Sequence, residues 1–259
     1  MMHALLLVAA CALAASQEPG EEVISKFAER TYQFTGGPYE NETFRYRLLS
    51  PETIEPGKKY PVVLFLHGRG ESGDDNVAQL KYLPTLMATP EYQKKFPCFF
   101  IAPQCREGKL WVARGPDKTG VSEQMQVAEA VLQETLKKYP IDPARVYLTG
   151  LSMGGFGAWN LAARHPDWFA AMVPICGGGD PNDAAELAKL PIWAVHGSDD
   201  KVVPPSLSRT MVEAVRAAGG NVKYSELPGV GHDSWTPAYE DPQGALPWMF
   251  EQKKPAAAK

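Results

Sequence analysis

The segment from Gly150 to Gly154 has the clearest chemical potential in this chain. It reads GLSMG, so a serine lies two residues from a glycine on each side. The run before it, 145–149, predicts a buried strand, and the run after it, 155–164, predicts a helix. A serine on such a tight strand-to-helix turn is strained and exposed, and the glycines remove side chains that would clash there. The pattern predicts a nucleophile at Ser152, with an ordinary glycine-rich turn as the alternative.

A serine hydroxyl needs a neighbouring base, and histidine is scarce in this chain. Where this type of turn carries the nucleophile, the acid and then the histidine follow it along the chain. His232 has that position, in a glycine-flanked loop after the strand-like run 222–227, and a surface-loop histidine is the alternative. His67 and His196 each end a predicted strand, and we interpret them as structural.

The acid has two candidates, Asp199 and Asp200, in the loop after the apolar run 192–195. The carboxyl ends of strands are where α/β sheets build their sites. The two residues are adjacent, so their side chains point in different directions, and the spacing alone leaves both open. The backbone N–H of Met153, which follows the serine, is the expected first donor to a developing oxyanion.

Several separate motifs occur in one order along the chain, and together they are more specific than any one of them. On these motifs the chain resembles the α/β-hydrolase superfamily from about Thr31 to Phe250. The resemblance is to its secreted "predicted peptidase" or phospholipase/carboxylesterase branch, which is related to dienelactone hydrolases and to feruloyl and acetyl esterases. The motifs are LHGRGESGDDN at 66–76, APQC at 102–105, GLSMGG at 150–155, ICGGG at 175–179 and GHDSW at 231–235.

This resemblance implies roles for two further residues. The block from His196 to Pro204 matches the family signature HGxxDxxVP, which makes Asp200 the acid and leaves Asp199 as the fallback. By similarity to the family's HGx turn, the second oxyanion donor is the backbone N–H of Arg69. The resemblance implies a serine hydrolase that cleaves carboxylic esters through an acyl-enzyme, without a cofactor. A serine peptidase on the same residues is the alternative.

The expected architecture is a single α/β-hydrolase domain with a mostly parallel central sheet and helices on both faces. An antiparallel hairpin precedes it, with strands at 31–34 and 43–49. Further strands are expected at 61–67, 98–103, 145–149, 170–175, 191–196 and 222–227, and helices at 122–138 and 206–218, the second with Ser206 as its N-cap.

Substrate preference is predicted from the loops. Hydrolase lids usually follow the strand after the nucleophile helix, and here only residues 177–190 are available, which is too short for a lipase lid. An open site buries little of a long acyl chain, so we expect short-chain or aryl esters, with carbohydrate-linked esters left open. Trp111 and Trp235 lie in loops expected to flank the site, where they would bind substrate by stacking on a ring. Core packing is the alternative for each.

Composition excludes other classes of protein. The net charge is -4 with both signs interspersed, which argues against a nucleic-acid partner. The histidines and aspartates of the predicted site are possible metal ligands, but no metal-binding spacing organises them, so no metal is expected. A non-catalytic binding module with this fold is a further alternative, which the complete set of catalytic residue types argues against. The sequence leaves the oligomeric state open.

The first 16 residues are interpreted as a cleaved signal peptide, because residues 4–15 are apolar but too short to span a bilayer. A lipobox ending at Cys11 is the less favoured alternative. The expected mature protein is secreted or periplasmic, with a hydrolase domain at 17–252, a disordered tail at 253–259 and no membrane span. Cys98, Cys105 and Cys176 are treated as small buried residues, although export permits one disulfide among them.

Overall fold

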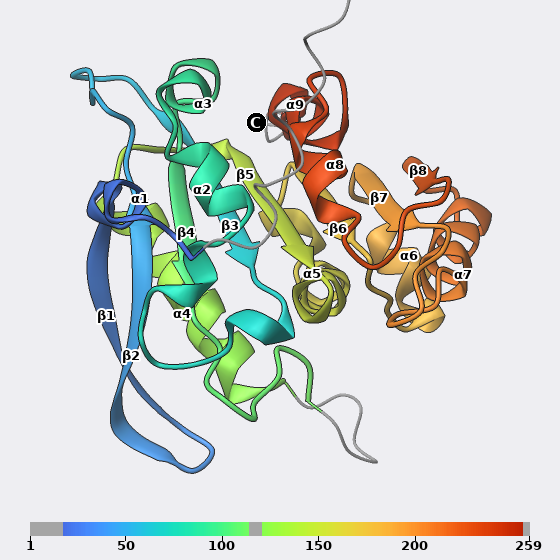
Figure 1. Ribbon diagram of the computed structural model, residues 1–259, viewed down its shortest axis with the longest axis horizontal. Helices are drawn as coiled ribbons and strands as arrows, with labels where there is room; N and C mark the ends of the chain where they lie inside the picture. Colours follow the sequence, from blue (N-terminus) through green and yellow to red (C-terminus); the bar gives the residue numbers. More distant parts are fainter. Residues whose placement is uncertain (1–17, 114–120, 256–259) are drawn as a thin grey trace, which may run out of the picture.

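The computed structural model describes residues 18–113 and 121–255, and its centre is an eight-stranded sheet (Figure 1). The strand order is β1-β2-β4-β3-β5-β6-β7-β8. The pairs β1–β2 and β2–β4 are antiparallel, and all the others are parallel. The strands are β1 (Phe27–Gly36), β2 (Tyr39–Leu49), β3 (Tyr60–Leu66), β4 (Phe99–Pro103), β5 (Ile141–Leu151), β6 (Ala171–Ile175), β7 (Ile192–Gly197) and β8 (Val222–Leu227).

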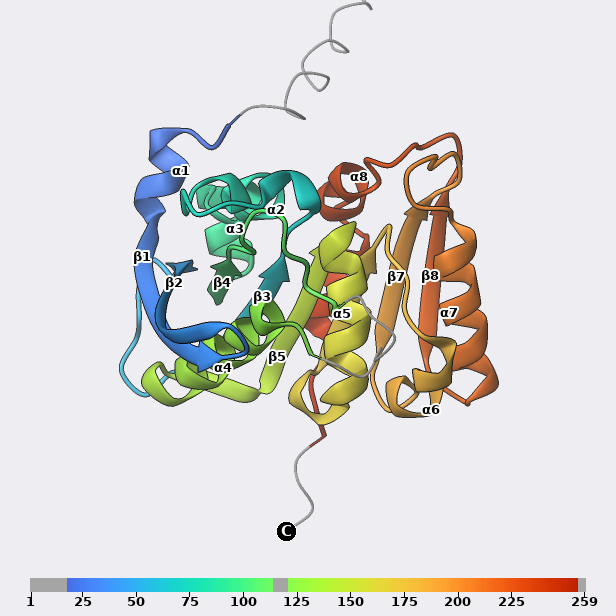
Figure 2. The same cartoon turned by 90° about the horizontal axis from the view of Figure 1, so that it is seen from below.

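Helices cover both faces of this sheet (Figure 2). They are α1 (Glu21–Lys26), α2 (Leu83–Met87), α3 (Pro90–Lys95), α4 (Glu123–Lys138), α5 (Met153–Arg164), α6 (Ala184–Leu187), α7 (Ser206–Ala217), α8 (Trp235–Glu240) and α9 (Ala245–Glu251). Short 3₁₀ turns are η1 (Arg69–Glu71), η2 (Ala78–Leu80), η3 (Pro166–Trp168) and η4 (Pro181–Asp183). None of the described helices is long and apolar enough to cross a membrane.

Alternation along the strands divides the core in two. In β3, Val62, Leu64 and Leu66 pack with residues of α4 to α7, whereas Val63 and Phe65 pack with residues of α2, α8 and α9. Successive side chains of a strand point to opposite faces, and all of β3 is buried, as is usual for a parallel strand with helices on both sides. The two clusters pack on opposite faces of the sheet. The carboxyl ends of its parallel strands lie along one edge of the sheet.

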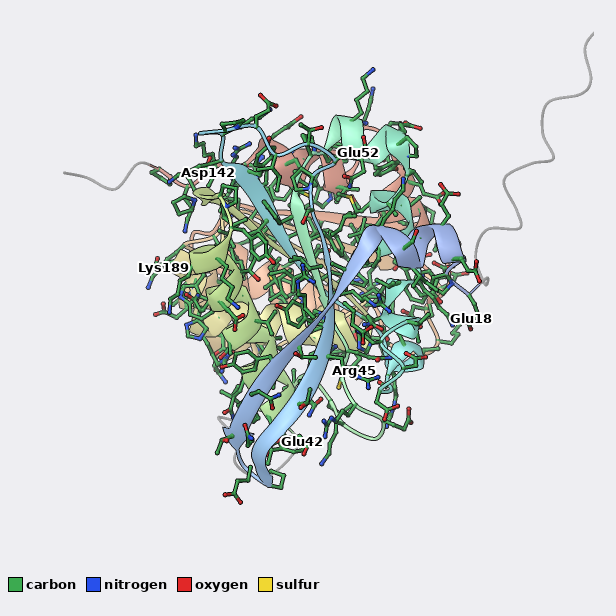
Figure 3. All side chains as sticks on the ribbon, turned by 90° about the vertical axis from the view of Figure 1, so that its left-hand side faces the viewer. Glu18, Glu42, Arg45, Glu52, Asp142 and Lys189 are labelled. Carbon is green, nitrogen blue, oxygen red and sulfur yellow. The ribbon has the colours of Figure 1, made fainter. Side chains whose placement is uncertain are left out.

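The β1–β2 hairpin forms one border of the sheet and crosses the front of the view in Figure 3, where Glu42 and Arg45 are labelled. Its buried Arg47 donates from Nε to the backbone oxygen of Asn76 at 2.7 Å and from Nη1 to that of Phe27 at 3.0 Å. The hairpin therefore anchors the long loop that follows β3, which the sequence places beside the nucleophile.

The observed fold confirms the predicted α/β-hydrolase architecture, including the antiparallel hairpin. The hairpin strands are longer than expected, because their outer residues pair across the turn as far as Gly36 and Tyr39. Ser206 is the first residue of α7 and not its N-cap, which is Pro205. Residues 253–255 of the expected tail are among the described residues, and Lys254 donates its backbone N–H to the oxygen of Ala144 at 2.9 Å. The proposed signal peptide and residues 256–259 lie outside the described residues.

Candidate active site

The site lies where the strand order reverses. The connection after β3 leads to β4, on one side of β3. The connection after β5 leads to β6, toward the opposite border of the sheet, so the two connections run in different directions. Such a switch point opens a crevice at the carboxyl ends of the strands. Leu66, the last residue of β3, pairs with Gly150 near the end of β5, so the loop after β3 and the GLSMG turn begin at the same level.

Ser152 has a strained backbone on this turn. Its φ is 51° and its ψ is -116°, a left-handed conformation that few non-glycine residues adopt. Its N–H donates to the backbone oxygen of Ile175 at 3.0 Å and lies 3.3 Å from Sγ of Cys176, so the next strand along the sheet holds the turn. Met153 is the first residue of α5, and its N–H is one of those that a helix start leaves without an intrahelical partner.

Three side chains from separate loops form one hydrogen-bonded chain. Nε2 of His232 lies 2.9 Å from Oγ of Ser152, and its Nδ1 lies 2.7 Å from Oδ2 of Asp200. Asp199 is exposed, and its carboxylate accepts from the hydroxyl of Ser198. Of the two acids that the sequence left open, the geometry therefore selects Asp200 as the partner of His232.

The environment of Asp200 keeps its carboxylate ionised. Burial alone would raise the pKa of Asp200, but hydrogen bonds from His232 and from the backbone N–H groups of Val203 and Val202 outweigh burial and hold this pKa below its usual range. The side chain of Asp200 is fully buried, whereas that of His232 is 19% exposed. A charged acid thus orients a histidine whose other nitrogen faces Oγ of Ser152.

The loop after β3 packs against the turn without space for side chains. A Cβ atom on Gly154 would overlap the backbone oxygen of Leu66, and one on Gly68 would lie 2.8 Å from the side chain of Leu151. Arg69 follows at once, as the first residue of η1. These contacts bring the backbone of this loop beside Ser152. The role of the Arg69 N–H as an oxyanion donor stays a prediction.

Two buried polar side chains hold this loop in place. Gln104 accepts the backbone N–H of Asn76 at 2.7 Å and donates to the backbone oxygen of Glu71 at 3.1 Å. His67 accepts the backbone N–H of Cys105 through Nε2 at 2.9 Å, which leaves its proton on Nδ1, 2.6 Å from the oxygen of Gly68. The interpretation of His67 as structural fits these contacts.

The two tryptophans are not placed alike. Trp111 is 1% exposed, and its Nε1–H donates to the backbone oxygen of His67 at 3.0 Å. Its expected substrate-binding role is therefore corrected to core packing, because its polar atom and its surface are both used inside the protein. Trp235 is the first residue of α8 and not a loop residue; its ring centre lies 5.3 Å from that of His232 and 5.3 Å from that of Tyr82. A substrate-binding role for Trp235 stays a prediction.

Cys176, Asp200 and His232 offer one ligand atom each within 4.8 Å of one another. Such a group resembles a small metal site in donor type. However, burial raises the pKa of the Cys176 thiol, so the thiolate that metals prefer is disfavoured. Asp200 and His232 already satisfy each other through their hydrogen bond. The three donors therefore fit a hydrogen-bonded serine site better than a metal centre.

Three residues that the structure brings to the site had no site role in the sequence analysis: Tyr82 was not singled out, Cys176 was treated as a small buried residue, and His196 was interpreted as structural. Cys176 has a φ of 40° and touches the N–H of Ser152, and Tyr82 has a φ of 63° and packs on Trp235. His196 contacts Asp200 directly. His196 had a usable signal, its place four residues before the acid, and Cys176 had one, its place directly after the predicted strand 170–175. The place of Tyr82 depends on backbone strain that the sequence does not display. The three described cysteines are buried and free.

A sequence model of the family described as phospholipase/carboxylesterase matches residues 112–244, which include Ser152, Asp200 and His232. The chain belongs to the phospholipase/carboxylesterase family. The match covers the second half of the sheet and ends in the loop before α9.

Other comparisons agree with this family. The crystal structure of a thermostable esterase superimposes with a TM-score of 0.82 at 37% identity, over 90% of this chain and 64% of that one. NocK of Nocardia uniformis subsp. tsuyamanensis, which is named as an esterase, is 28% identical over 225 residues, or 83% of this chain and 61% of NocK. The feruloyl esterase module of Clostridium thermocellum shares the fold, with a TM-score of 0.63 at 18% identity, over 91% of this chain and 94% of that one. This chain thus spans less than two thirds of the first two proteins.

Proposed function

We propose that this member of the phospholipase/carboxylesterase family hydrolyses carboxylic esters through an acyl-enzyme. The observation that carries the proposal is the continuous chain from Ser152 through His232 to Asp200, with distances of 2.9 Å and 2.7 Å. Each residue has the type and the order that a nucleophile, a base and an orienting acid require. The esterase names of the two similar proteins support the same reaction class.

In the proposed mechanism, Nε2 of His232 takes the hydroxyl proton as Oγ of Ser152 bonds to the ester carbonyl carbon. The carbonyl π electrons move to the oxygen, and the oxyanion accepts the N–H groups of Met153 and Arg69. Asp200 stabilises the imidazolium that forms. The intermediate then breaks the bond to the alcohol oxygen, which receives the proton from His232. Water then loses a proton to His232 as its oxygen bonds to the acyl carbon. The bond from that carbon to Oγ of Ser152 breaks, Oγ receives the proton from His232, and the carboxylic acid leaves.

The decisive test is covalent labelling combined with turnover. We expect a fluorophosphonate probe to label the wild type at Ser152, and both Ser152→Ala and His232→Ala to lose ester turnover by a factor on the order of 10⁴–10⁶. Circular dichroism should show that both variants are folded. Full activity in folded Ser152→Ala would refute the proposed function, and turnover that a chelator abolishes would indicate a metal mechanism.

For the substrate class we propose short-chain or aryl esters, with carbohydrate-linked esters as the finer option. The connection from β6 to β7 supports this class, since it contains only η4 and the four-residue α6. Nothing in this segment is long enough to fold over a long acyl chain. A panel of acetyl, butyryl and feruloyl esters beside matched peptide amides distinguishes an esterase from a peptidase.

We also propose export after cleavage before Gln17. The apolar run at 4–15 and the small residues Ala14 and Ser16 support it. The intact mass of the protein recovered from the medium or periplasm tests this proposal. A lipid-modified mass starting at Cys11 would contradict it.

A further inference from the structure

The carboxylate of Asp200 faces two histidines, of which only one belongs to the catalytic chain proposed above. Oδ2 lies 2.7 Å from Nδ1 of His232 and 3.2 Å from Nε2 of His196. Oδ1 accepts the backbone N–H groups of Val202 and Val203 at 2.8 Å and 2.9 Å. The side chains of Asp200 and His196 are both fully buried. Both oxygens of the acid therefore have close polar neighbours, and Nε2 of His196, which hydrogen-bonds the Val203 oxygen at 2.9 Å, is the second such neighbour of Oδ2.

The contacts of His196 fix the position of its proton. Its Nε2 faces the backbone oxygen of Val203 at 2.9 Å as well as Oδ2 of Asp200. Both partners only accept hydrogen bonds, because Asp200 is ionised, so Nε2 must carry a hydrogen. Nδ1 lies 2.7 Å from Oγ of Ser208, so in this tautomer the single hydroxyl proton of Ser208 must point to Nδ1 and not to the backbone oxygen of Gly177. The tautomer with its proton on Nε2 thus gives both ring nitrogens of His196 a hydrogen-bond partner. In His67 the proton is on the other nitrogen, Nδ1.

Three elements prevent the His196 ring from turning. His196 is on β7, and Ser208 is in the first turn of α7. Oγ of Ser208 also lies 3.0 Å from the backbone oxygen of Gly177, just after β6. Rotation of the ring would break its contacts with Ser208 and Val203 together. The Nε2–H is therefore held at a fixed position, between the Val203 oxygen at 2.9 Å and Oδ2 of Asp200 at 3.2 Å.

The other titratable groups around this pair leave Asp200 as its anion. His232 and Cys176 face the acid, and burial raises the pKa of the Cys176 thiol, which keeps it protonated. Glu226, on β8, is the remaining acid that faces His196, and its charge is paired with Arg209 at 2.6 Å. Among the described residues, Asp200 is thus the buried anion next to the His196 N–H.

We propose that His196 is a positioning residue whose Nε2–H holds Oδ2 of Asp200 in the orientation that accepts from His232. This inference rests on the proposed esterase function. Without this donor, Oδ2 of the buried carboxylate loses a close N–H neighbour and is less restrained in its position relative to His232. The carboxylate also becomes a stronger acceptor toward the catalytic histidine, which favours the protonated and inactive base. Both the rate and its pH dependence should therefore respond to His196.

Two amide substitutions separate this role from packing. In His196→Gln the side-chain amide nitrogen reaches the position of Nε2 and can donate to Asp200. In His196→Asn it reaches only the position of Nδ1, beside Ser208. We expect kcat/KM for an aryl ester at pH 7 to fall about 10- to 100-fold in His196→Asn, the effect of one lost hydrogen bond to a charge, but less than about 5-fold in His196→Gln.

The pH profile decides between positioning and structure. In His196→Asn the acid limb of kcat/KM should move to higher pH by about half a unit or more, whereas in His196→Gln it should match the wild type. Two variants that lose activity equally, with the wild-type acid limb, would overturn the proposal. If the wild type cleaves no ester, the proposed function fails instead, and the wild-type tautomer then decides the role of His196.

That tautomer can be measured without any substitution at His196. In protein labelled with ¹⁵N-histidine, the one-bond and two-bond couplings of the ring show which nitrogen is protonated. We expect a proton on Nε2 of His196 near neutral pH, and on Nδ1 of His67 as an internal reference. A proton on Nδ1 alone of His196 would remove the donor to Asp200 and overturn the inference, even if both variants failed to fold.

Discussion

The backbone oxygen of Leu66 occupies the space that a side chain on Gly154 would need. A Cβ atom built on Gly154 would overlap this oxygen and would lie 2.8 Å from the oxygen of His67. The turn that carries Ser152 and the loop expected to supply the second oxyanion donor are thus in backbone contact. The glycine on the helix side of the serine is required by this contact, in addition to the strain of the turn itself.

Substitution of Gly154 should therefore damage both stability and catalysis. We expect Gly154→Ala to lower the free energy of unfolding by about 2–4 kcal/mol, since backbone on both sides must move apart. The loop after β3 should shift with it, and kcat/KM should fall at least 100-fold because the oxyanion donors separate. Thermal unfolding and ester turnover measure the two effects.

A glycine in open space provides the control for this substitution. A Cβ atom on Gly20 would have no neighbour within 4 Å, so Gly20→Ala should keep wild-type turnover and a nearly unchanged melting temperature. Wild-type stability and activity in Gly154→Ala would show that the two loops are not in the contact described.

The choice between the two adjacent acids is open to a direct test. Asp200→Asn should lower kcat/KM by a factor on the order of 10⁴, because the histidine loses the charge that orients it and stabilises its protonated form. Asp199→Asn should change it less than about 3-fold, because Asp199 is exposed and its carboxylate hydrogen-bonds only the Ser198 hydroxyl among the described residues. Steady-state kinetics on one aryl ester suffice. The reverse order of effects would mean that the loop has a different register from the one described.

Local sequence patterns predicted the sheet and the order of the catalytic residues, whereas contacts between distant residues decided the rest. The alternation of apolar strands and amphipathic helices predicted the sheet, because burial on both faces leaves a long apolar run such as that of β3. The order of Ser152, Asp200 and His232 along the chain was also visible, since each residue ends or follows a strand. These features depend on neighbours within a few residues.

Other features depend on residues far apart in the chain, and the sequence did not reveal them. Trp111 is buried because the loop after β3 offers it the oxygen of His67, 44 residues away. The direction of Asp200 is set by its hydrogen bonds in the folded loop and by His232, and its neighbour Asp199 looks the same in the sequence. The strain at Tyr82 and Cys176 has no counterpart in residue type, because it is imposed by the contacts of each backbone.

Buried His67 should make the protein less stable in acid. Burial lowers the pKa of His67 to about 4, whereas an unfolded chain binds this proton near its ordinary value of about 6.5. Between these values the unfolded state binds more protons, so the free energy of unfolding falls as pH falls. The loss should reach roughly 3 kcal/mol by pH 4 and be complete once pH has passed below the folded value.

Urea unfolding between pH 4 and pH 7 measures this effect in wild type and in His67→Gln. The variant should be less stable at pH 7, because the Gly68 oxygen loses its Nδ1–H donor, but its stability should change less across this range. Other groups that titrate there contribute equally to both proteins and cancel in the difference. Parallel curves for the two proteins would show that His67 already binds its proton when folded.

The last prediction concerns the length of the acyl chain. After β6 the chain passes through three consecutive glycines at 177–179 and two short turns before β7, so this segment offers few side chains to bury an alkyl group. Each added CH₂ should therefore improve kcat/KM by well under the ~0.8 kcal/mol of full burial, which corresponds to less than about 4-fold per carbon. The gain should end after a few carbons.

An ester also releases an alkoxide, which needs less help from His232 than an amine does, so matched peptide amides should react slowly or not at all. A 4-nitrophenyl series from acetate to palmitate, with feruloyl esters and peptide anilides beside it, measures both trends. A rate that climbs steadily to the longest chains, or that is higher for the amides than for the esters, would contradict the open, ester-directed site proposed for this protein.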